Sequence, residues 1–324
     1  MTTDSPRRAR VLLTAELHPA LLAELERHCE VVLAPEASPP TIARLIVDAD
    51  ALIVRNQLAP DVFDDAPRLR AVVRHGVGLD MIPVEAATAR GIPVANLPGS
   101  NTAAVVEFCL GAMLHLRRGL AAMDARLRSE GWAAARPMSD HGSELGGGVI
   151  GIVGVGAVGS RLAVVASALG MRVLGLTRRP ASLPAGVEAV DKATLFALSD
   201  VVVLCCPLNE QTRGLVDAAA LAAMKPDALL VNVSRGPVVD TPALLAALRA
   251  GRLGGAALDV HDRQPLRTDE PVFDAPNLLL TPHVAGTTAT SMQAMSRGAV
   301  ATVLALLRGE RPANVVNPEV FGQR

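Results

Sequence analysis

The segment VIGIVGVGAVGSRLAVVASALG, residues 149–170, constrains the fold of this chain more than any other. An aliphatic run leads into Gly154, Gly156 and Gly159 in the spacing G-x-G-x-x-G, and an alanine-rich helical pattern follows. In such a strand–turn–helix, the first glycine permits a tight turn, the second lets the backbone approach a pyrophosphate, and the third lets helix and strand pack closely. A glycine-rich turn without a ligand is the alternative. The context on both sides favours dinucleotide binding at the helix N-terminus.

The end of the next predicted strand, MRVLGL, bears on the choice of cofactor. Sheets that bind NAD carry an acid here for the ribose hydroxyls. This chain has Thr177, Arg178 and Arg179 instead. A carboxylate would repel a 2′-phosphate, whereas two guanidiniums attract one. The sequence therefore favours NADP over NAD, and the alternative is that both arginines are solvated loop residues.

Short aliphatic runs alternate with helical patterns along the whole chain, which predicts an α/β fold with parallel sheets. The runs fall into two series, separated by a helical pattern at 102–127 and an irregular loop at 129–148. We therefore expect two Rossmann-like or flavodoxin-like domains, with the active site in the cleft between them. The first series reads RVLLTA, CEVVLA, ADALIVR, LRAVVRH and GIPVANL, and the second reads VIGIVG, MRVLGLT, DVVVLCC, DALLVNVS, GGAALDV and NLLLTPH.

Composition excludes several classes of function. The formal net charge is −1, so the chain has no basic field for nucleic acid or an anionic membrane surface. No apolar run approaches the roughly 20 residues of a membrane span. The N-terminal segment lacks a long apolar signal core, and the four cysteines show no metal-ligand or disulfide spacing. We expect a cytoplasmic protein without a metal site.

Three consecutive strands of the second series end in residues that suit chemistry on a small acid. Arg235 can bind a carboxylate or polarise a ketone oxygen. His283 can carry the proton that accompanies a hydride, because imidazole titrates near neutrality. Gln264 lies in the loop after the strand between them. Each residue alone has a plain structural alternative, but the carboxyl ends of parallel strands meet at one edge, where ligands bind.

With these motifs in place, the chain resembles the D-isomer-specific 2-hydroxyacid dehydrogenase family. That family includes phosphoglycerate dehydrogenase, glyoxylate/hydroxypyruvate reductase and, more distantly, formate dehydrogenase. The resemblance covers nearly the whole chain. It rests on the segments HGVGLDMIPVEAATARGIPVANLPGSNTAAVVE, GIVGVGAVG, PLNEQTRGLV, VNVSRGPVVDTPALLAAL, ALDVHDRQPL and LTPHVAG.

The resemblance implies a role for each part of the chain. Residues 1–101 plus 287–324 would bind the substrate, a small 2-keto or 2-hydroxy acid, and 102–286 would bind NADP or NAD. Arg235 would bind the substrate carboxylate and carbonyl, with His283 as acid and base. Further substrate contacts would come from Val77, Gly78 and Asn56. Cofactor contacts would come from Gly154, Gly156, Ala157, Val158, Gly159, Thr177, Arg178, Arg179, Cys206, Pro207, Val233, Asp259 and Gly286. The helix from Thr102 and the loop around Trp132 match the region through which the family forms homodimers.

Gln264 departs from the family pattern, which has a catalytic glutamate here. An amide can accept a hydrogen bond and orient the histidine, but it adds no charge to stabilise the imidazolium. Formate dehydrogenases also pair glutamine with histidine, so a non-alcohol acid is an alternative substrate. A nucleotide-sensing corepressor-like protein is the alternative outside enzymes. We favour an NAD(P)-dependent oxidoreductase that interconverts a 2-keto acid and its D-2-hydroxy acid.

Overall fold

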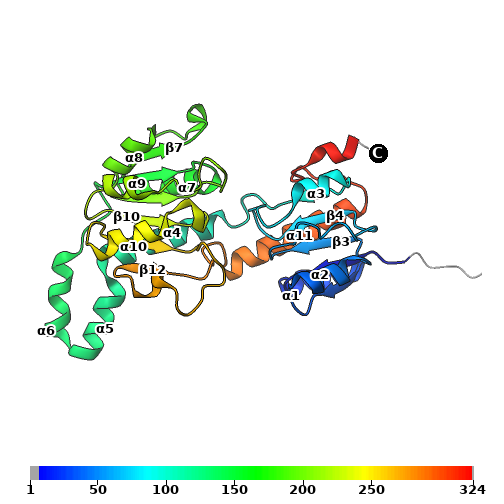
Figure 1. The fold of residues 1–324 in the computed structure, drawn as a ribbon, viewed down its shortest axis with the longest axis horizontal. Helices are drawn as coiled ribbons and strands as arrows, with labels where there is room; N and C mark the ends of the chain where they lie inside the picture. Colours follow the sequence, from blue (N-terminus) through cyan, green and yellow to red (C-terminus); the bar gives the residue numbers. More distant parts are fainter. Residues whose placement is uncertain (1–6, 323–324) are drawn as a thin grey trace, which may run out of the picture. The chain divides into compact units, whose positions relative to one another are not determined.

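The computed structural model describes residues 7–322. The chain divides into two compact units (Figure 1). The first unit contains Met1–Asn101 and Thr287–Arg324, and the second contains Thr102–Gly286. Each unit is an α/β fold around one parallel sheet, which confirms the predicted fold class.

The first unit is built on a five-stranded parallel sheet in the order β2-β1-β3-β4-β5, which is the flavodoxin-like order. Its central strands read ALIV and AVVR and are buried on both faces, as parallel strands under helices usually are. The strands are β1 (Arg10–Leu13), β2 (Glu30–Leu33), β3 (Ala51–Val54), β4 (Ala71–Arg74) and β5 (Val94–Ala95).

Helices cover both faces of this sheet because successive strand residues point to opposite sides. Val11 and Leu13 pack in a core with α1 and α11, whereas Leu12 packs in a second core with α2. The helices are α1 (Pro19–His28), α2 (Pro39–Ile46), α3 (Val84–Ala89) and α11 (Ala289–Leu307), with the short 3-10 helix η5 (Pro318–Gly322).

The segment after α11 closes the edge of the sheet beside β5. Val315 forms an antiparallel bridge with Ala95, and the Val316 N–H donates to the Val94 carbonyl oxygen at 2.8 Å. The Asn317 side chain accepts from the Val94 N–H at 2.7 Å. The backbone of this segment satisfies an edge that would otherwise be unpaired.

The second unit is built on a seven-stranded parallel sheet in the order β12-β11-β10-β9-β6-β7-β8. Counted from β6, this is the Rossmann order with one added strand, and the direction of winding reverses between β6 and β9. The strands are β6 (Val149–Val153), β7 (Arg172–Leu176), β8 (Val187–Ala189), β9 (Val201–Leu204), β10 (Leu229–Asn232), β11 (Gly255–Leu258) and β12 (Leu278–Leu280). The strand β8 was not predicted, because its three residues, VEA, carry no aliphatic run.

The predicted helix at 102–127 is two helices. Gly119 has φ +57°, a left-handed conformation that ends α4 and starts α5 in a new direction (Figure 1). The helices of this unit are α4 (Thr102–Arg118), α5 (Leu120–Glu130), α6 (Trp132–Ala135), α7 (Ala157–Ala168), α8 (Lys192–Leu198), α9 (Ala218–Ala223) and α10 (Thr241–Arg249). Short 3-10 helices are η1 (Arg136–His141), η2 (Pro180–Ser182), η3 (Gly236–Val238) and η4 (Pro271–Asp274).

Candidate active site

The glycine-rich turn after β6 packs against the chain that follows β9. Gly154 has φ +90°, which residues with a side chain rarely adopt, and a Cβ there would lie 2.6 Å from Cys206 Cα. A Cβ on Gly159 would lie closer than 3.0 Å to the Gly154 carbonyl oxygen. A side chain at either position would therefore displace the turn from the sheet.

The N-terminus of α7 is uncapped, whereas the neighbouring helices have capped ends. Asp191, Asp217 and Asp240 cap α8, α9 and α10, and each carboxylate accepts from a first-turn N–H. The N-cap of α7 is Gly156, and apart from Gly156 itself and its two chain neighbours no described residue has an atom within 4 Å of where its Cβ would be. Because first-turn N–H groups and the helix dipole attract anions, the residues present fit a dinucleotide pyrophosphate.

Val158 follows Ala157 in the first turn of α7, and Thr177, Arg178 and Arg179 follow β7. Thr177 Oγ1 accepts from the Arg179 N–H at 3.2 Å, so the threonine shapes this turn. Both arginines are exposed, and within residues 7–322 neither guanidinium has a hydrogen-bond or ion-pair partner. Two guanidiniums at this strand end can attract a phosphate group.

Cys206 and Pro207 follow β9, and Val233 follows β10, at the same edge of the sheet as the glycine-rich turn. Burial raises the pKa of the Cys206 thiol. The Ser234 hydroxyl donates to the Cys206 carbonyl oxygen, which ties the two strand ends together. A buried, protonated thiol is a poor nucleophile, so Cys206 contributes packing at this edge of the sheet and no chemistry.

Asp259, which follows β11, is 1% exposed and organises the chain after β12. Its carboxylate accepts from the Thr281 hydroxyl at 2.7 Å and from the N–H groups of Val284 (2.8 Å) and Ala285 (2.9 Å). Its carbonyl oxygen accepts from the His283 N–H at 2.8 Å. These bonds hold His283 at φ +58°, a conformation that costs of order 1 kcal/mol for a residue with a side chain. Gly286 is the last residue of the second unit.

The structure brings Gln264 and His283 together from the ends of two neighbouring strands. His283 Nδ1 lies 2.8 Å from Gln264 Oε1, and both side chains are exposed. Because an amide oxygen only accepts, this contact assigns the proton to Nδ1, and Nε2 is then the nitrogen that changes protonation. The glutamine orients the ring without adding charge.

Arg235 follows β10 in extended backbone, directly before η3. Its Nη1 donates to the Ser234 carbonyl oxygen at 2.6 Å, and the Asn232 side chain donates to the Arg235 carbonyl oxygen at 3.0 Å. The side chain is half-buried, so the direction of the guanidinium is restricted.

Backbone contact couples the turn that carries Arg235 to the loop that carries Gln264. A Cβ on Gly236 would lie closer than 3.0 Å to the backbone of His261 and Asp262. His261 Nε2 lies 2.9 Å from the Thr281 carbonyl oxygen, which holds the same loop against the end of β12. The three strand ends form one packed group.

The remaining predicted site residues lie in the first unit, at the carboxyl ends of its strands. Asn56 follows β3, and its Oδ1 accepts from the Thr14 hydroxyl at 3.1 Å, which leaves Nδ2 to donate to a ligand. Val77 and Gly78 follow β4. Both sheets thus carry their predicted site residues at the edge where ligands of α/β folds bind.

Two side chains that were not predicted as site residues, those of Arg74 and Asn96, hold the loop after β4. Arg74 donates from Nε to the Gly78 carbonyl oxygen at 3.1 Å and from Nη1 to that of Val54 at 3.1 Å. Asn96 donates from Nδ2 to the Val77 carbonyl oxygen at 2.7 Å. The sequence does carry one signal for Arg74, because an arginine is unusual as the last residue of a buried strand and it directly precedes H-G-V-G.

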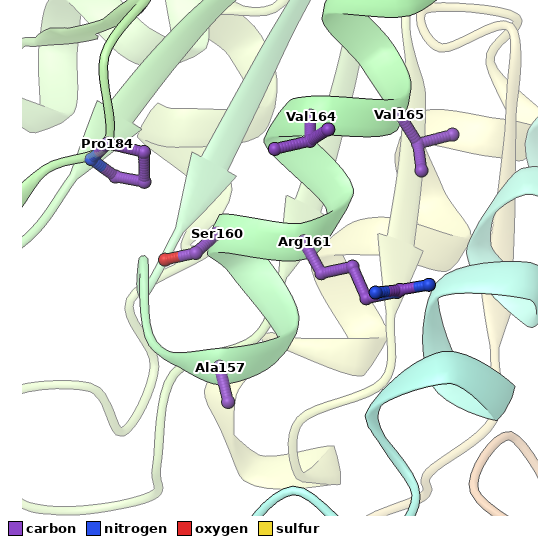
Figure 2. A pocket seen from close by; sticks show the side chains of 6 residues that line it. All are labelled: Ala157, Ser160, Arg161, Val164, Val165 and Pro184. Atoms are coloured by element: carbon purple, nitrogen blue, oxygen red, sulfur yellow. The ribbon is translucent and has the colours of Figure 1, made fainter.

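A cavity of about 450 Å³ lies beside α7, between the helix and Pro184 (Figure 2). In this view Arg161 points away from Pro184, and Ala157 is at the start of the helix. Its lining residues are Ala157, Ser160, Arg161, Val164, Val165 and Pro184. Of the predicted site residues it contains Ala157 alone, so it is a different place from the Gln264–His283 pair.

Within residues 7–322, no three His, Cys, Asp or Glu side chains gather as metal ligands. No helix in that range combines the length and the apolar character needed to cross a membrane.

Comparisons with known proteins agree with this architecture. The family model "D-isomer specific 2-hydroxyacid dehydrogenase, NAD binding domain" matches residues 110–285. A glyoxylate reductase from Korarchaeum cryptofilum is 36% identical, over 97% of this chain and 98% of that protein. A protein of known structure from Thermus thermophilus has a TM-score of 0.88 at 36% identity, over 95% of this chain and 99% of that one.

An NADPH-dependent glyoxylate/hydroxypyruvate reductase from Sinorhizobium meliloti, solved with NADP and malonate, has a TM-score of 0.87 at 30% identity. The match covers 97% of this chain and 98% of that one. The matched family model includes the uncapped α7 turn and the strand ends that carry Arg235, Gln264 and His283. The chain therefore belongs to the D-isomer-specific 2-hydroxyacid dehydrogenase family, and it is an NAD(P)-dependent oxidoreductase that interconverts 2-keto acids and 2-hydroxy acids.

Proposed function

We propose that this chain reduces a small 2-keto acid, glyoxylate or a close analogue, to the D-2-hydroxy acid, and that it prefers NADPH. The observation that carries the proposal is the contact between His283 Nδ1 and Gln264 Oε1 at 2.8 Å, on strand ends packed against the turn of Arg235. The relatives from Korarchaeum cryptofilum and Sinorhizobium meliloti support the substrate class, since both are named for glyoxylate.

A nicotinamide cofactor, held at the glycine-rich turn and the N-terminus of α7, would supply the hydride. Arg235 binds the substrate carboxylate and draws electron density toward the ketone oxygen. The N–H groups of Val77 and Gly78 also donate to the substrate carboxylate. As the hydride reaches the carbonyl carbon, the Nε2 proton of His283 moves to the oxygen and the alcohol forms. Gln264 keeps the Nδ1 proton in place throughout, so the ring does not rotate.

Gln264 also favours a second candidate, the oxidation of an acid that lacks an alcohol, such as formate. That reaction removes a hydride and needs no proton on a substrate oxygen, so a neutral partner for His283 is sufficient. Turnover with a panel of 2-keto acids and with formate, using both cofactors, separates the two. We expect keto-acid reduction and no formate oxidation. Activity on formate alone would replace the first proposal with the second.

The cofactor preference rests on Arg178 and Arg179, which we assign to the 2′-phosphate. We expect NADPH to give a higher kcat/KM than NADH. Changing both arginines to Ala should reduce that ratio about tenfold or more, since charge-assisted hydrogen bonds are lost. Arg172→Ala, at the opposite end of β7, is the matched control and should leave the ratio unchanged. A wild-type protein that uses NADH equally well would exclude the preference.

We further propose that the protein is a homodimer that forms through α5 and α6. No residue of α5 is buried, although Leu120 and Leu127 lie on it, and the adjacent Trp132 is 73% exposed. Figure 1 shows the two helices as an arm that leaves the end of α4. A second copy of the chain would cover these apolar side chains.

We also place the protein in the cytoplasm, with a small acid as its ligand and no nucleic acid. All four cysteines are free thiols, which suits a reducing compartment. The net charge of −1 supports neither a nucleic-acid surface nor a membrane surface.

A further inference from the structure

Every carbonyl oxygen of loop 75–78, which follows β4, is occupied by a donor from the first unit. Two of these donors, the side chains of Arg74 and Asn96, have no role in the proposed reaction. The bonds run from Arg74 Nη1 to His75 (2.9 Å), from the Leu97 N–H to Gly76 (2.9 Å), from Asn96 Nδ2 to Val77 (2.7 Å) and from Arg74 Nε to Gly78 (3.1 Å). The acceptors of this loop are therefore all turned toward the protein.

The N–H groups of the same loop divide into two pairs. Those of His75 and Gly76 donate to carbonyl oxygens of the protein, at 2.8 Å and 2.9 Å. Within the described residues, those of Val77 and Gly78 donate to no protein acceptor. Two successive free N–H groups on a loop whose carbonyl oxygens point away form an anion-binding concavity.

Arg74 adds charge as well as hydrogen bonds. A Cβ on Gly76 would lie 3.2 Å from Arg74 Cζ, so the guanidinium is directly against the loop. Its field reaches the neighbouring side chain: burial, then Arg55, then Arg74 lower the pKa of His75 to about 4. A cation behind two free N–H groups strengthens their attraction for a carboxylate.

Asn96 is itself held from both sides. Its carbonyl oxygen accepts from Asn314 Nδ2 at 2.7 Å, and its N–H donates to the Asn314 carbonyl oxygen at 3.3 Å. The segment after α11 thereby fixes the position of the side chain that holds Val77. Loop 75–78 is braced by one charged and one neutral side chain.

We propose that Arg74 and Asn96 are positioning residues that keep the Val77 and Gly78 N–H groups directed at the substrate carboxylate. They thereby set the preference of the enzyme for a 2-keto acid over an uncharged ketone of the same shape. This inference rests on the proposed role of Val77 and Gly78 as carboxylate donors.

The test compares each 2-keto acid with its own amide, which keeps the ketone and removes the charge. In Arg74→Met and Asn96→Ala, we expect KM for the acid to rise about tenfold and KM for the amide to stay unchanged. The kcat for the acid should change much less than its KM, and the affinity for NADPH should be retained. Arg74→Lys keeps the charge but cannot span the carbonyl oxygens, so its effect should be intermediate. Arg70→Met, just before β4, is the control and should behave as wild type.

The outcomes separate this inference from the function on which it rests. If the wild-type enzyme does not prefer the acid over the amide, the carboxylate role of Val77 and Gly78 is wrong. If it does, and both variants lose activity on acid and amide equally, Arg74 and Asn96 are merely structural and the inference is overturned. Asn96→Ala removes one neutral bond, so it decides the question should Arg74→Met fail to fold.

Discussion

At the scale of single residues, Gln264 is an amide where the family resemblance leads us to expect a glutamate beside the proposed catalytic histidine. Its Oε1 still holds His283 Nδ1 at 2.8 Å, so orientation is retained while charge is lost. Asp262, two residues earlier, is held by the Thr241 hydroxyl, which donates to its Oδ2 at 2.8 Å. The two properties that a glutamate would combine are therefore separable in this enzyme.

The change Gln264→Glu should extend keto-acid reduction toward alkaline pH. Reduction requires the protonated ring, so activity falls as the pH rises and the proton is lost. A carboxylate at Nδ1 stabilises the protonated ring and should move this fall by about one pH unit or more. The measurement is kcat/KM against pH with one keto acid. Gln264→Ala should lower kcat at every pH without that displacement, and an unmoved alkaline limb in the glutamate variant would contradict the assignment.

His75 makes a second prediction, on stability. It is 3% exposed, its Nε2 lies 3.0 Å from Ser296 Oγ, and its pKa is lowered to about 4 by burial first and then by Arg55 and Arg74. Well above pH 6.5 the ring is neutral in both folded and unfolded chains, so it adds no pH dependence. As the pH falls toward 4, the unfolded chain takes up the proton and the folded chain does not, so unfolding becomes easier by about 3 kcal/mol.

Urea unfolding of wild type and of His75→Asn between about pH 7 and pH 4.5 measures this difference. The variant should lose less unfolding free energy over that interval. The exposed His141, changed to Asn, serves as the control and should follow wild type. Equal losses in wild type and His75→Asn would show that His75 takes up its proton in the folded protein.

At the scale of elements, the strand ends that carry the proposed catalytic residues touch through backbone. Gly236→Ala would introduce a Cβ closer than 3.0 Å to the backbone of His261 and Asp262. The loop that carries Gln264 must then move, so kcat should fall about a hundredfold while NADPH affinity changes little. Gly111→Ala in α4, where a Cβ meets open space, is the matched control. A Gly236→Ala variant with normal kcat would show that turnover does not depend on how these two loops pack against each other.

The boundaries of the strands and helices show where local sequence patterns are sufficient to predict an element. The strands with buried aliphatic runs were predictable, since each run is itself the cause of the burial. The edge strand β8 was not, because its pairing partner β7 creates it and its own three residues do not. The helix at 102–127 was predicted as one because its apolar spacing continues past Gly119, whose positive φ alone ends α4.

At the scale of the whole molecule, the exposed apolar residues of α5 and α6 allow a test of the proposed dimer. Combining Leu127→Glu with Trp132→Ala should convert a dimer of 33.6 kDa chains into a monomer, because a charge would be buried and an anchor lost. Light scattering after gel filtration measures the mass. The control is Val47→Glu, which replaces an exposed apolar residue in the first unit and should leave the dimer intact. A wild-type monomer would exclude this arm as a dimer contact.

The sequence by itself determined the two parallel sheets, the dinucleotide turn and the strand ends at which Arg235, Gln264 and His283 lie. These features follow from short-range patterns: aliphatic runs, glycine spacing and the rule that parallel strands present their carboxyl ends together. Only the tertiary structure decided which groups meet there. The Gln264–His283 contact joins residues 19 apart, and Arg74 reaches a carbonyl oxygen 20 residues earlier. No local pattern encodes such pairs, because strand register and helix packing set those distances.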